Sequence, residues 1–175
     1  GLKVISDGEQ AESIPVTSSV NASGGTFRDS DLLTILKDKR IRSIYRDSSD
    51  RLWFSTFSYL GLVCYDHGKV TRFTTSDGMP SERIRTVYEC PDGSVMAVCT
   101  GGLVVIRDGK IEKVFGKDDG IDNTELLTAV RADNGDTIIG TDGGGIYIIG
   151  ENNEIKHLNV EAGDISSDVV MRIKK

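Results

Sequence analysis

Proline and long apolar runs are both scarce in this chain, and their scarcity excludes several classes of protein. Only 3 of the 175 residues are proline, too few for a collagen-like or proline-rich disordered chain. The longest uninterrupted apolar run is the five residues Val95–Cys99, whereas a membrane-spanning helix needs about 20. No segment is therefore expected to cross a bilayer or to act as a signal peptide.

Basic charge is also in deficit. The chain has 21 Lys and Arg against 27 Asp and Glu, which gives a formal net charge of −6. Surfaces that bind nucleic acids or anionic membranes depend on stripes of Lys and Arg. The composition therefore predicts no nucleic-acid partner and no membrane contact by this chain itself.

Cysteine and histidine are too few and too dispersed for a metal site. Cys64, Cys90 and Cys99 show no C-x-x-C spacing, so neither a zinc site nor a disulfide framework is expected. We predict buried free thiols, although a bridge from Cys64 to Cys90 or Cys99 stays open if the protein is exported. His67 and His157 have no ligand partners at suitable spacing. We therefore expect two solvated histidines, no metal and no cofactor.

Glycine, by contrast, is abundant, and the sequence repeats itself about every 42 residues. There are 20 glycines, about 11% of the chain against a usual level of about 7%, which predicts many tight turns. Three copies with coinciding apolar columns begin at Ile41, Ile84 and Leu126, at offsets of 43 and 42 residues. A fourth copy starts at Val170, as VMRIKK.

Each copy reads as four short strands joined by hairpins. The first strand ends in a polar turn (DSSD, CPDG or ADNGD), and the third strand opens at a glycine in every copy. The pairs Asp92-Gly93 and Asn134-Gly135 are expected to supply the positive φ angles of two-residue hairpins. No segment shows the 3.6-residue period of a helical solenoid. Four-stranded units at this spacing are typical of β-propeller blades.

The sequence therefore predicts an all-β fold, a β-propeller fragment of four-stranded antiparallel blades. About three complete blades are expected, with partial blades at both ends. The boundaries are residues 1–16 for the last two strands of a preceding blade, 17–40 for an irregular connection, 41–82, 83–124 and 125–168 for the three blades, and 169–175 for the first strand of a following blade. A start at GLKVIS, without methionine, is typical of a fragment of a longer chain.

The segment from Gly78 to Ile106, GMPSERIRTVYECPDGSVMAVCTGGLVVI, resembles the two-component regulator propeller repeat. That pattern runs Gly-Leu-Pro-Ser, a strand, Asp-x-x-Gly, Leu-Trp-Ile-Gly-Thr and a Gly-Gly-Leu strand. The first copy supplies Leu52-Trp53, although Asp50-Arg51 lacks the turn glycine. The third copy keeps Ile139-Gly140-Thr141 but has Asp122-Asn123 in place of Pro-Ser. The resemblance covers residues 35–175, and more weakly 1–16. The Gly-His and Trp-Asp dipeptides of WD40 blades are absent.

The resemblance implies a sensor. In this family the propeller repeats form the extracytoplasmic input region of membrane-anchored bacterial proteins, which are hybrid histidine kinases or diguanylate cyclases. The ligand in that family is frequently a glycan fragment, so a small molecule or glycan is the expected ligand here. We therefore expect a non-catalytic ligand-sensing or dimerisation region, located in the periplasm or at the cell surface. Because orphan strands at both ends leave unpaired sheet edges, we expect either self-association through these edges or imperfect closure by pairing of the last strand with the first.

The candidate ligand contacts follow from the geometry of a propeller. The loop between the second and third strands shares one rim with the connection between blades, where ligands usually bind. Residues expected on that rim are Tyr59, Arg83, Thr100 and Asp142. Trp53, inside a second strand, is expected to pack between blades instead.

Two other functions stay open. A propeller enzyme resembling the streptogramin-inactivating lyases would gather His and Glu residues on one rim, but both histidines of this chain are expected away from that rim. An intracellular protein-interaction scaffold is the other alternative. The sequence thus predicts no catalytic residues.

Overall fold

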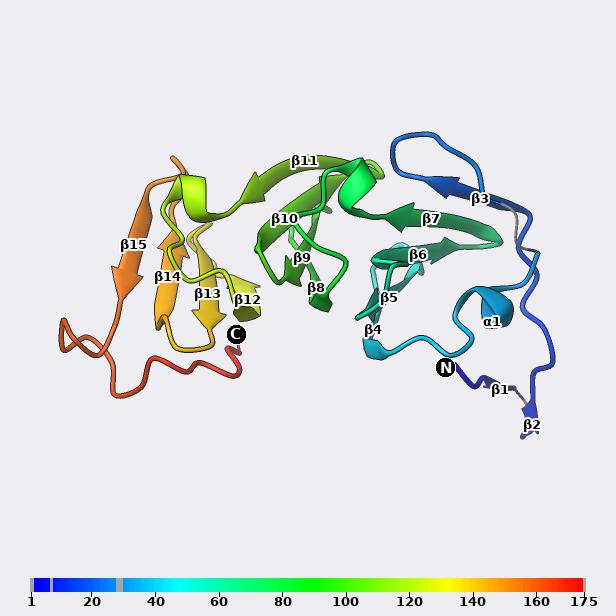
Figure 1. Ribbon diagram of the computed structural model, residues 1–175, viewed down its shortest axis with the longest axis horizontal. Helices are drawn as coiled ribbons and strands as arrows, with labels where there is room; N and C mark the ends of the chain where they lie inside the picture. The colour runs from blue at the N-terminus through cyan, green and yellow to red at the C-terminus, as the bar shows by residue number, and fades with distance from the viewer. Residues whose placement is uncertain (1, 7, 28–29, 175) are drawn as a thin grey trace.

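The computed structural model describes residues 2–6, 8–27 and 30–174. Residues 1, 7, 28, 29 and 175 lie outside it, and they fall within the segments predicted as the preceding blade, the irregular connection and the following blade. The described chain forms an arc of three sheets that fan out from a concave side (Figure 1). Among the described residues, no helix has both the length and the apolar character needed to cross a bilayer.

Each sheet is built from four consecutive strands joined by hairpins, as the repeat predicts. The first strand of each sheet lies on the concave side and the fourth on the convex side (Figure 1). The strands are β4 (Ile41–Arg46), β5 (Leu52–Thr56), β6 (Leu62–Asp66) and β7 (Lys69–Phe73); β8 (Ile84–Glu89), β9 (Val95–Cys99), β10 (Gly102–Arg107) and β11 (Lys110–Phe115); and β12 (Leu126–Arg131), β13 (Thr137–Thr141), β14 (Ile146–Ile149) and β15 (Ile155–Leu158). The predicted all-β fold with three propeller blades is confirmed.

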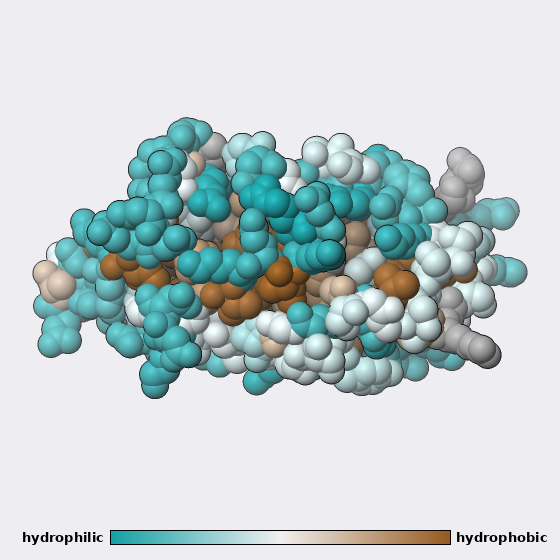
Figure 2. All heavy atoms as spheres, turned by 90° about the horizontal axis from the view of Figure 1, so that it is seen from above, coloured by the Kyte–Doolittle hydropathy of each residue, from teal (hydrophilic) through white to brown (hydrophobic). Residues whose placement is uncertain are grey.

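The hydrophobic core lies between the sheets. Trp53 and Phe73 of the first sheet pack against Ile84 and Val104 of the second. Met96 and Leu103 belong to an equivalent cluster between the second and third sheets. Seen from the convex side, apolar side chains form a band with hydrophilic residues along both flanks (Figure 2). Facing sheets therefore bury their apolar faces against each other, which explains why the repeat occurs in series.

Trp53 packs as predicted, and its polar atom is paired as well. The indole is 2% exposed, and its Nε1 donates a 2.7 Å hydrogen bond to the buried Asp47 carboxylate. Arg51 donates to the same carboxylate from its backbone amide and its Nε. Burial alone would raise the pKa of Asp47, but the bonds from Trp53 and Arg51 outweigh it and lower that pKa.

The glycine that opens each third strand is required by close packing. A Cβ on Gly61, Gly102 or Gly145 would approach the carbonyl oxygen of Phe73, Phe115 or Leu158, at the end of the fourth strand, well within 3.0 Å. Gly61 and Gly145 also have positive φ angles of 66° and 72°. The third and fourth strands can therefore come this close only because a side chain is absent.

The structure corrects the predicted turn types. In the turn after β8, a type I turn is followed by Gly93. The Gly93 amide donates a hydrogen bond to the Cys90 carbonyl, and the Cys90 amide donates one to the Ser94 carbonyl. Gly93 has a φ of 79°, so this is a three-residue loop closed by a left-handed residue. Asp50 holds the same position in the first copy with a φ of 65°, since Asp tolerates this region. The turns with two positive φ angles are instead His67-Gly68 and Asp108-Gly109.

The segment predicted as an irregular connection, residues 17–40, contains ordered structure. Strand β3 (Ser18–Asn21) pairs in parallel with β7 and makes a five-stranded sheet. The one-turn helix α1 (Leu32–Ile35) is capped by Asp31, whose side chain accepts from the amide of Thr34. Its residues Leu32 and Ile35 pack into a third cluster on the outer face of the first sheet. This segment is ordered because it shields an edge and a face of the first sheet that would otherwise be exposed.

At its two ends the described chain has less regular structure than in the three blades. Residues 1–16 contain only a short hairpin of β1 (Ile5–Ser6) and β2 (Glu9–Gln10). Residues 169–174 form no regular strand: Val169 makes an isolated bridge to Asp142, and the Val170 amide donates to the Thr141 carbonyl. Val169 thus holds the position that Arg83 and Glu125 hold just before β8 and β12, so this segment lies where the first strand of a following blade is predicted.

Between the sheets, each fourth strand leads into the next first strand through a short 3-10 helix. These helices are η1 (Thr75–Asp77) and η2 (Lys117–Asp119). In η1 the Asp77 carboxylate accepts from the backbone and hydroxyl of Thr74. Gly78 and Gly120 end the two helices in the left-handed conformation. The connections are thus ordered, and they fix the rim beside the first strands.

Candidate functional site

One rim of the arc joins neighbouring sheets through equivalent backbone contacts. Three isolated antiparallel bridges recur there, pairing Phe57 with Arg83, Thr100 with Glu125, and Asp142 with Val169. Within each sheet, the residue after the second strand also donates a backbone hydrogen bond to the residue before the first strand. The amide of Phe57 lies 2.9 Å from the carbonyl oxygen of Arg40, and the amide of Thr100 lies 3.1 Å from that of Arg83. The rim is therefore a regular row in which backbone bonds fix each position.

Three of the four predicted contact residues lie in this row. The Thr100 amide donates to the Arg83 carbonyl, and the Asp142 amide donates to the Glu125 carbonyl at 2.9 Å. Tyr59 instead contacts Lys39, whose Nζ lies 3.0 Å from the Tyr59 hydroxyl and 4.5 Å from the ring centroid. With 71% of its surface exposed, the Tyr59 ring is accessible to a ligand. Their role as ligand contacts stays a prediction.

The structure corrects the expected position of one histidine. His157 lies on β15, and its Nε2 is 2.6 Å from the carbonyl oxygen of Gly144, in the loop between the second and third strands. Its ring stacks on Tyr147 with centroids 4.2 Å apart. His157 thus lies next to the rim and not away from it. His67 lies in the β6–β7 turn, where a hydrogen bond with Asp66 raises its pKa.

Four arginines on the rim surround a single aromatic ring. Arg40, Arg42, Arg83 and Arg85 place their guanidinium carbons 5.7, 4.7, 5.3 and 5.3 Å from the centroid of Phe57. We call these five residues the arginine cluster. Only Arg83 was identified from the sequence. The signal that finds the others is the tripeptide Arg-Ile-Arg, which occurs at residues 40–42 and again at 83–85.

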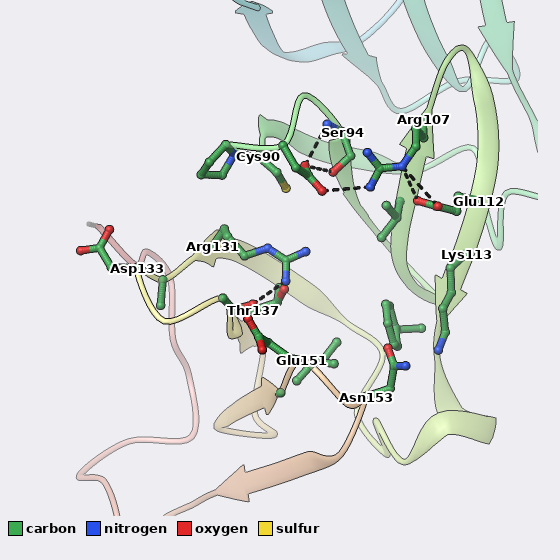
Figure 3. A pocket seen from close by; sticks show the side chains of 18 residues that line it. Cys90, Ser94, Arg107, Glu112, Lys113, Arg131, Asp133, Thr137, Glu151 and Asn153 are labelled. Carbon is green, nitrogen blue, oxygen red and sulfur yellow. Dashed lines mark hydrogen bonds and ion pairs between the residues drawn. The ribbon is translucent and has the colours of Figure 1, made fainter.

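The opposite rim holds a cavity of about 620 Å³ between the second and third sheets. Figure 3 shows that its walls carry charged groups from both sheets, among them Arg107, Glu112, Arg131 and Glu151. Arg107 donates to Asp92 at 2.9 Å and to Glu112 at 3.2 Å. The bonds from Ser94 and Arg107 hold the pKa of Asp92 well below its usual range. Arg107 is thus paired with two carboxylates, whereas Arg131 donates to the backbone carbonyl of Gly135.

The three cysteines lie in the interior of the blades. All three cysteines are free and buried, as predicted. Burial raises the pKa of Cys64 and of Cys99 to about 12, which keeps both thiols protonated and unreactive. Over the ranges that the structure describes, no group of three or more His, Cys, Asp or Glu residues could hold a metal ion.

Comparison with known proteins identifies the repeat. Residues 35–58 match the family model "Two component regulator propeller". This stretch covers the end of the α1 segment, β4 and β5, and it includes the Leu52-Trp53 pair on which the resemblance was based. The predicted regulator propeller repeat is therefore confirmed for the first blade. No curated protein matches the chain.

Solved structures of the same fold include bacterial extracellular domains. The extracellular domain of BT3049 from B. thetaiotaomicron, described as a hybrid two component system, matches with 19% identity, a TM-score of 0.67 and 95% coverage of this chain. That of BT4673, described in the same way, matches with 18% identity, a TM-score of 0.58 and 70% coverage. This chain spans only 20% and 19% of those two chains. At these identities the matches establish the propeller fold.

Propeller enzymes share the fold too. Virginiamycin B lyase from Staphylococcus aureus matches with 19% identity, a TM-score of 0.56 and 69% coverage of this chain, and 41% of the lyase is covered in return. The fold by itself therefore does not separate sensing from catalysis.

Proposed function

We propose that this chain is part of the ligand-sensing or dimerisation region of a bacterial membrane signalling protein and has no catalytic activity of its own. One observation carries this proposal: a two-component regulator propeller repeat at residues 35–58 lies in a chain whose fold matches an extracellular two-component domain over 95% of its length. We place the region outside the cytoplasm, as in those relatives, and its ligand is a small molecule or glycan fragment.

The chemistry of the rim supports binding over catalysis. Tyr59 and the arginine cluster offer aromatic and cationic contact surfaces, but neither includes a nucleophile paired with a general base. The thiols of Cys64 and Cys99 are buried and protonated. The carboxylate of Asp47 is fully engaged by Trp53 and Arg51. Residues of this kind recognise a ligand without transforming it.

A binding screen tests the proposal directly. The purified chain is titrated with oligosaccharides from bacterial, plant and host polysaccharides while its unfolding temperature is monitored. We expect at least one fragment to raise that temperature in a saturable manner. Tyr59→Ala or Arg83→Ala should weaken the effect, whereas Lys110→Ala, at the exposed start of β11, should not. Effects that rim and control variants weaken equally, or no effect from any fragment, would contradict the sensor role.

Self-association is the second part of the proposal. Strand β3 covers the outer edge of the first sheet, but β11 and β15 have no further partner strand in the described part of the chain. An unpaired edge strand offers its backbone groups to another chain. Sedimentation velocity across a range of concentrations should therefore show a dimer. Proline substitution at Lys156 in β15 should shift the population to monomer.

Lyase activity is the alternative that the fold leaves, and His157 is the residue that would favour it. Its ring lies at the rim, but it stacks on Tyr147 instead of facing a carboxylate. Incubation with a streptogramin B antibiotic, followed by mass spectrometry, should return the intact antibiotic. Accumulation of a cleaved product that His157→Ala abolishes would replace the sensor proposal with an enzymatic one.

A further inference from the structure

The arginine cluster concentrates positive charge in a chain of net negative charge. The guanidinium carbons of Arg40, Arg42, Arg83 and Arg85 all lie within 5.7 Å of the Phe57 centroid. Their separations are therefore comparable with the screening length of about 8 Å at physiological ionic strength. Significant cation-π contacts occur about once per 70 to 80 residues, so four on one ring mark this place as unusual.

Protein carboxylates do not neutralise this charge. Among the described residues, the guanidinium groups of Arg40, Arg42 and Arg83 form no ion pair, and Arg85 has only Glu125 at a distance of 4.0 Å. The Nε of Arg85 is buried and has no hydrogen-bond partner. A buried donor without a partner is costly, and here it adds to the mutual repulsion of four cations. The face of Phe57 attracts cations only weakly, by about 0.5–1 kcal/mol at an exposed site.

The cluster is produced by the repeat itself. The tripeptide Arg-Ile-Arg occupies residues 40–42 at the start of β4 and residues 83–85 at the start of β8. The bridge between Phe57 and Arg83 brings the two copies together on either side of one ring. In the third blade the equivalent residues are Glu125, Leu126 and Leu127. The positive region is therefore confined to the junction of the first two blades.

We propose that the arginine cluster binds an oxyanion group of the sensed ligand: a sulfate, phosphate or carboxylate. Guanidinium groups present paired N–H donors that match the oxygens of such groups. An oxyanion bound here would offset the repulsion among the four cations. Four guanidinium groups around one ring suit one or two oxyanions of a small ligand. This inference rests on the proposed sensing function and adds the charge of the ligand to it.

The test uses inorganic sulfate as the probe and the intact chain as the receptor. Calorimetric titration at a constant ionic strength of about 0.15 M should show saturable binding. Arg42→Gln combined with Arg85→Gln should weaken it at least tenfold. The matched control is Lys69→Gln combined with Lys110→Gln, which removes the same charge from exposed residues in two β-hairpins and should leave the affinity unchanged. Circular dichroism confirms that both double variants are folded.

A second variant makes the opposite prediction. Glu125→Gln removes the carboxylate that lies 4.0 Å from Arg85 and should tighten sulfate binding about threefold, since a unit charge at this range has a modest effect in water. In the wild-type chain the Nε–Hε signal of Arg85 should shift in NMR spectra as sulfate is added. Absence of binding, equal weakening by both double variants, or no gain with Glu125→Gln would overturn the anion site. If neutral oligosaccharides still raise the unfolding temperature in that case, the sensor role itself stands.

Discussion

Substitution of Gly145 by alanine tests whether close packing between the third and fourth strands holds each blade together. Gly145 has a φ of 72°, and a Cβ there would lie far too close to the carbonyl oxygen of Leu158 and 3.3 Å from the Cα of Asn159. Both neighbours are backbone atoms, so no side-chain rotation can relieve the overlap. The start of β14 would have to move away from the end of β15.

A neighbouring glycine separates the two costs of this substitution. Gly143 also has a positive φ, of 89°, but the nearest atom to its Cβ position is the Asn123 side-chain nitrogen, at 4.0 Å. Gly143→Ala should therefore lower the free energy of unfolding by about 1 kcal/mol, because alanine is strained in the left-handed backbone region. Gly145→Ala has the same backbone cost and in addition an overpacking cost of about 1–3 kcal/mol. We expect Gly145→Ala to lower the free energy of unfolding by about 2–4 kcal/mol.

Urea unfolding followed by far-UV circular dichroism measures both variants. Fluorescence of Trp53, the only tryptophan, reports on the first blade in the same samples. The dichroism midpoint should fall clearly more for Gly145→Ala than for Gly143→Ala. Equal losses would show that backbone conformation alone sets the requirement for glycine. An unchanged midpoint for Gly145→Ala would refute the packing explanation altogether.

Three further predictions concern the core, the pH response and the thiols. Trp53→Phe removes the indole bond to the buried Asp47 carboxylate and should cost about 2–4 kcal/mol of unfolding free energy; a loss below that of a typical surface substitution would contradict the role of this bond. Burial raises the pKa of Asp31, but the hydrogen bonds from Ile14, Thr34 and Ser13 outweigh burial and hold that pKa at about 2. The ionised carboxylate of Asp31 therefore contributes fully to stability above the unfolded pKa of 3.8, and this contribution disappears as the pH falls towards 2. Asp31→Asn should accordingly flatten the acid limb of the stability curve, and an unchanged limb would count against the capping bonds. Because Cys64, Cys90 and Cys99 are buried, a thiol-specific dye at pH 8 should label none of the three in the native chain and all three in urea, and fast native labelling would disprove this packing.

The repeat made the blades predictable from sequence. The third-strand glycines and the apolar second strands recur at fixed offsets, so each copy supports the assignment of the others. The strand β3 in the segment 17–40 was not predicted, because Ser18–Asn21 is short and largely polar and has no counterpart in the other copies. Its pairing with β7 is long-range in sequence and parallel, and no local pattern indicates it. Asp31 followed by two leucines was the one available sign of a helix start.

The candidate site was only partly accessible to the same reasoning. Arg83, Thr100 and Asp142 were assigned to one rim from topology, and the structure joins them through backbone bonds. Sequence reasoning did not identify Arg40, Arg42 and Arg85, because an arginine in or beside a strand usually indicates only a solvent-exposed position. Their convergence depends on the ring of Phe57, which the fold brings between two copies. Comparing the repeats column by column for charge, as well as for apolar residues, would have revealed them.

The backbone bonds of the rim leave its side chains free to vary. Arg40, Arg83 and Glu125 hold equivalent positions through their carbonyl oxygens, which every amino acid possesses. Arginine and glutamate are therefore equally compatible with the same scaffold, as the first two copies and the third illustrate. Substitutions at these positions can thus reverse the charge of the rim while the backbone bonds that join the blades stay in place.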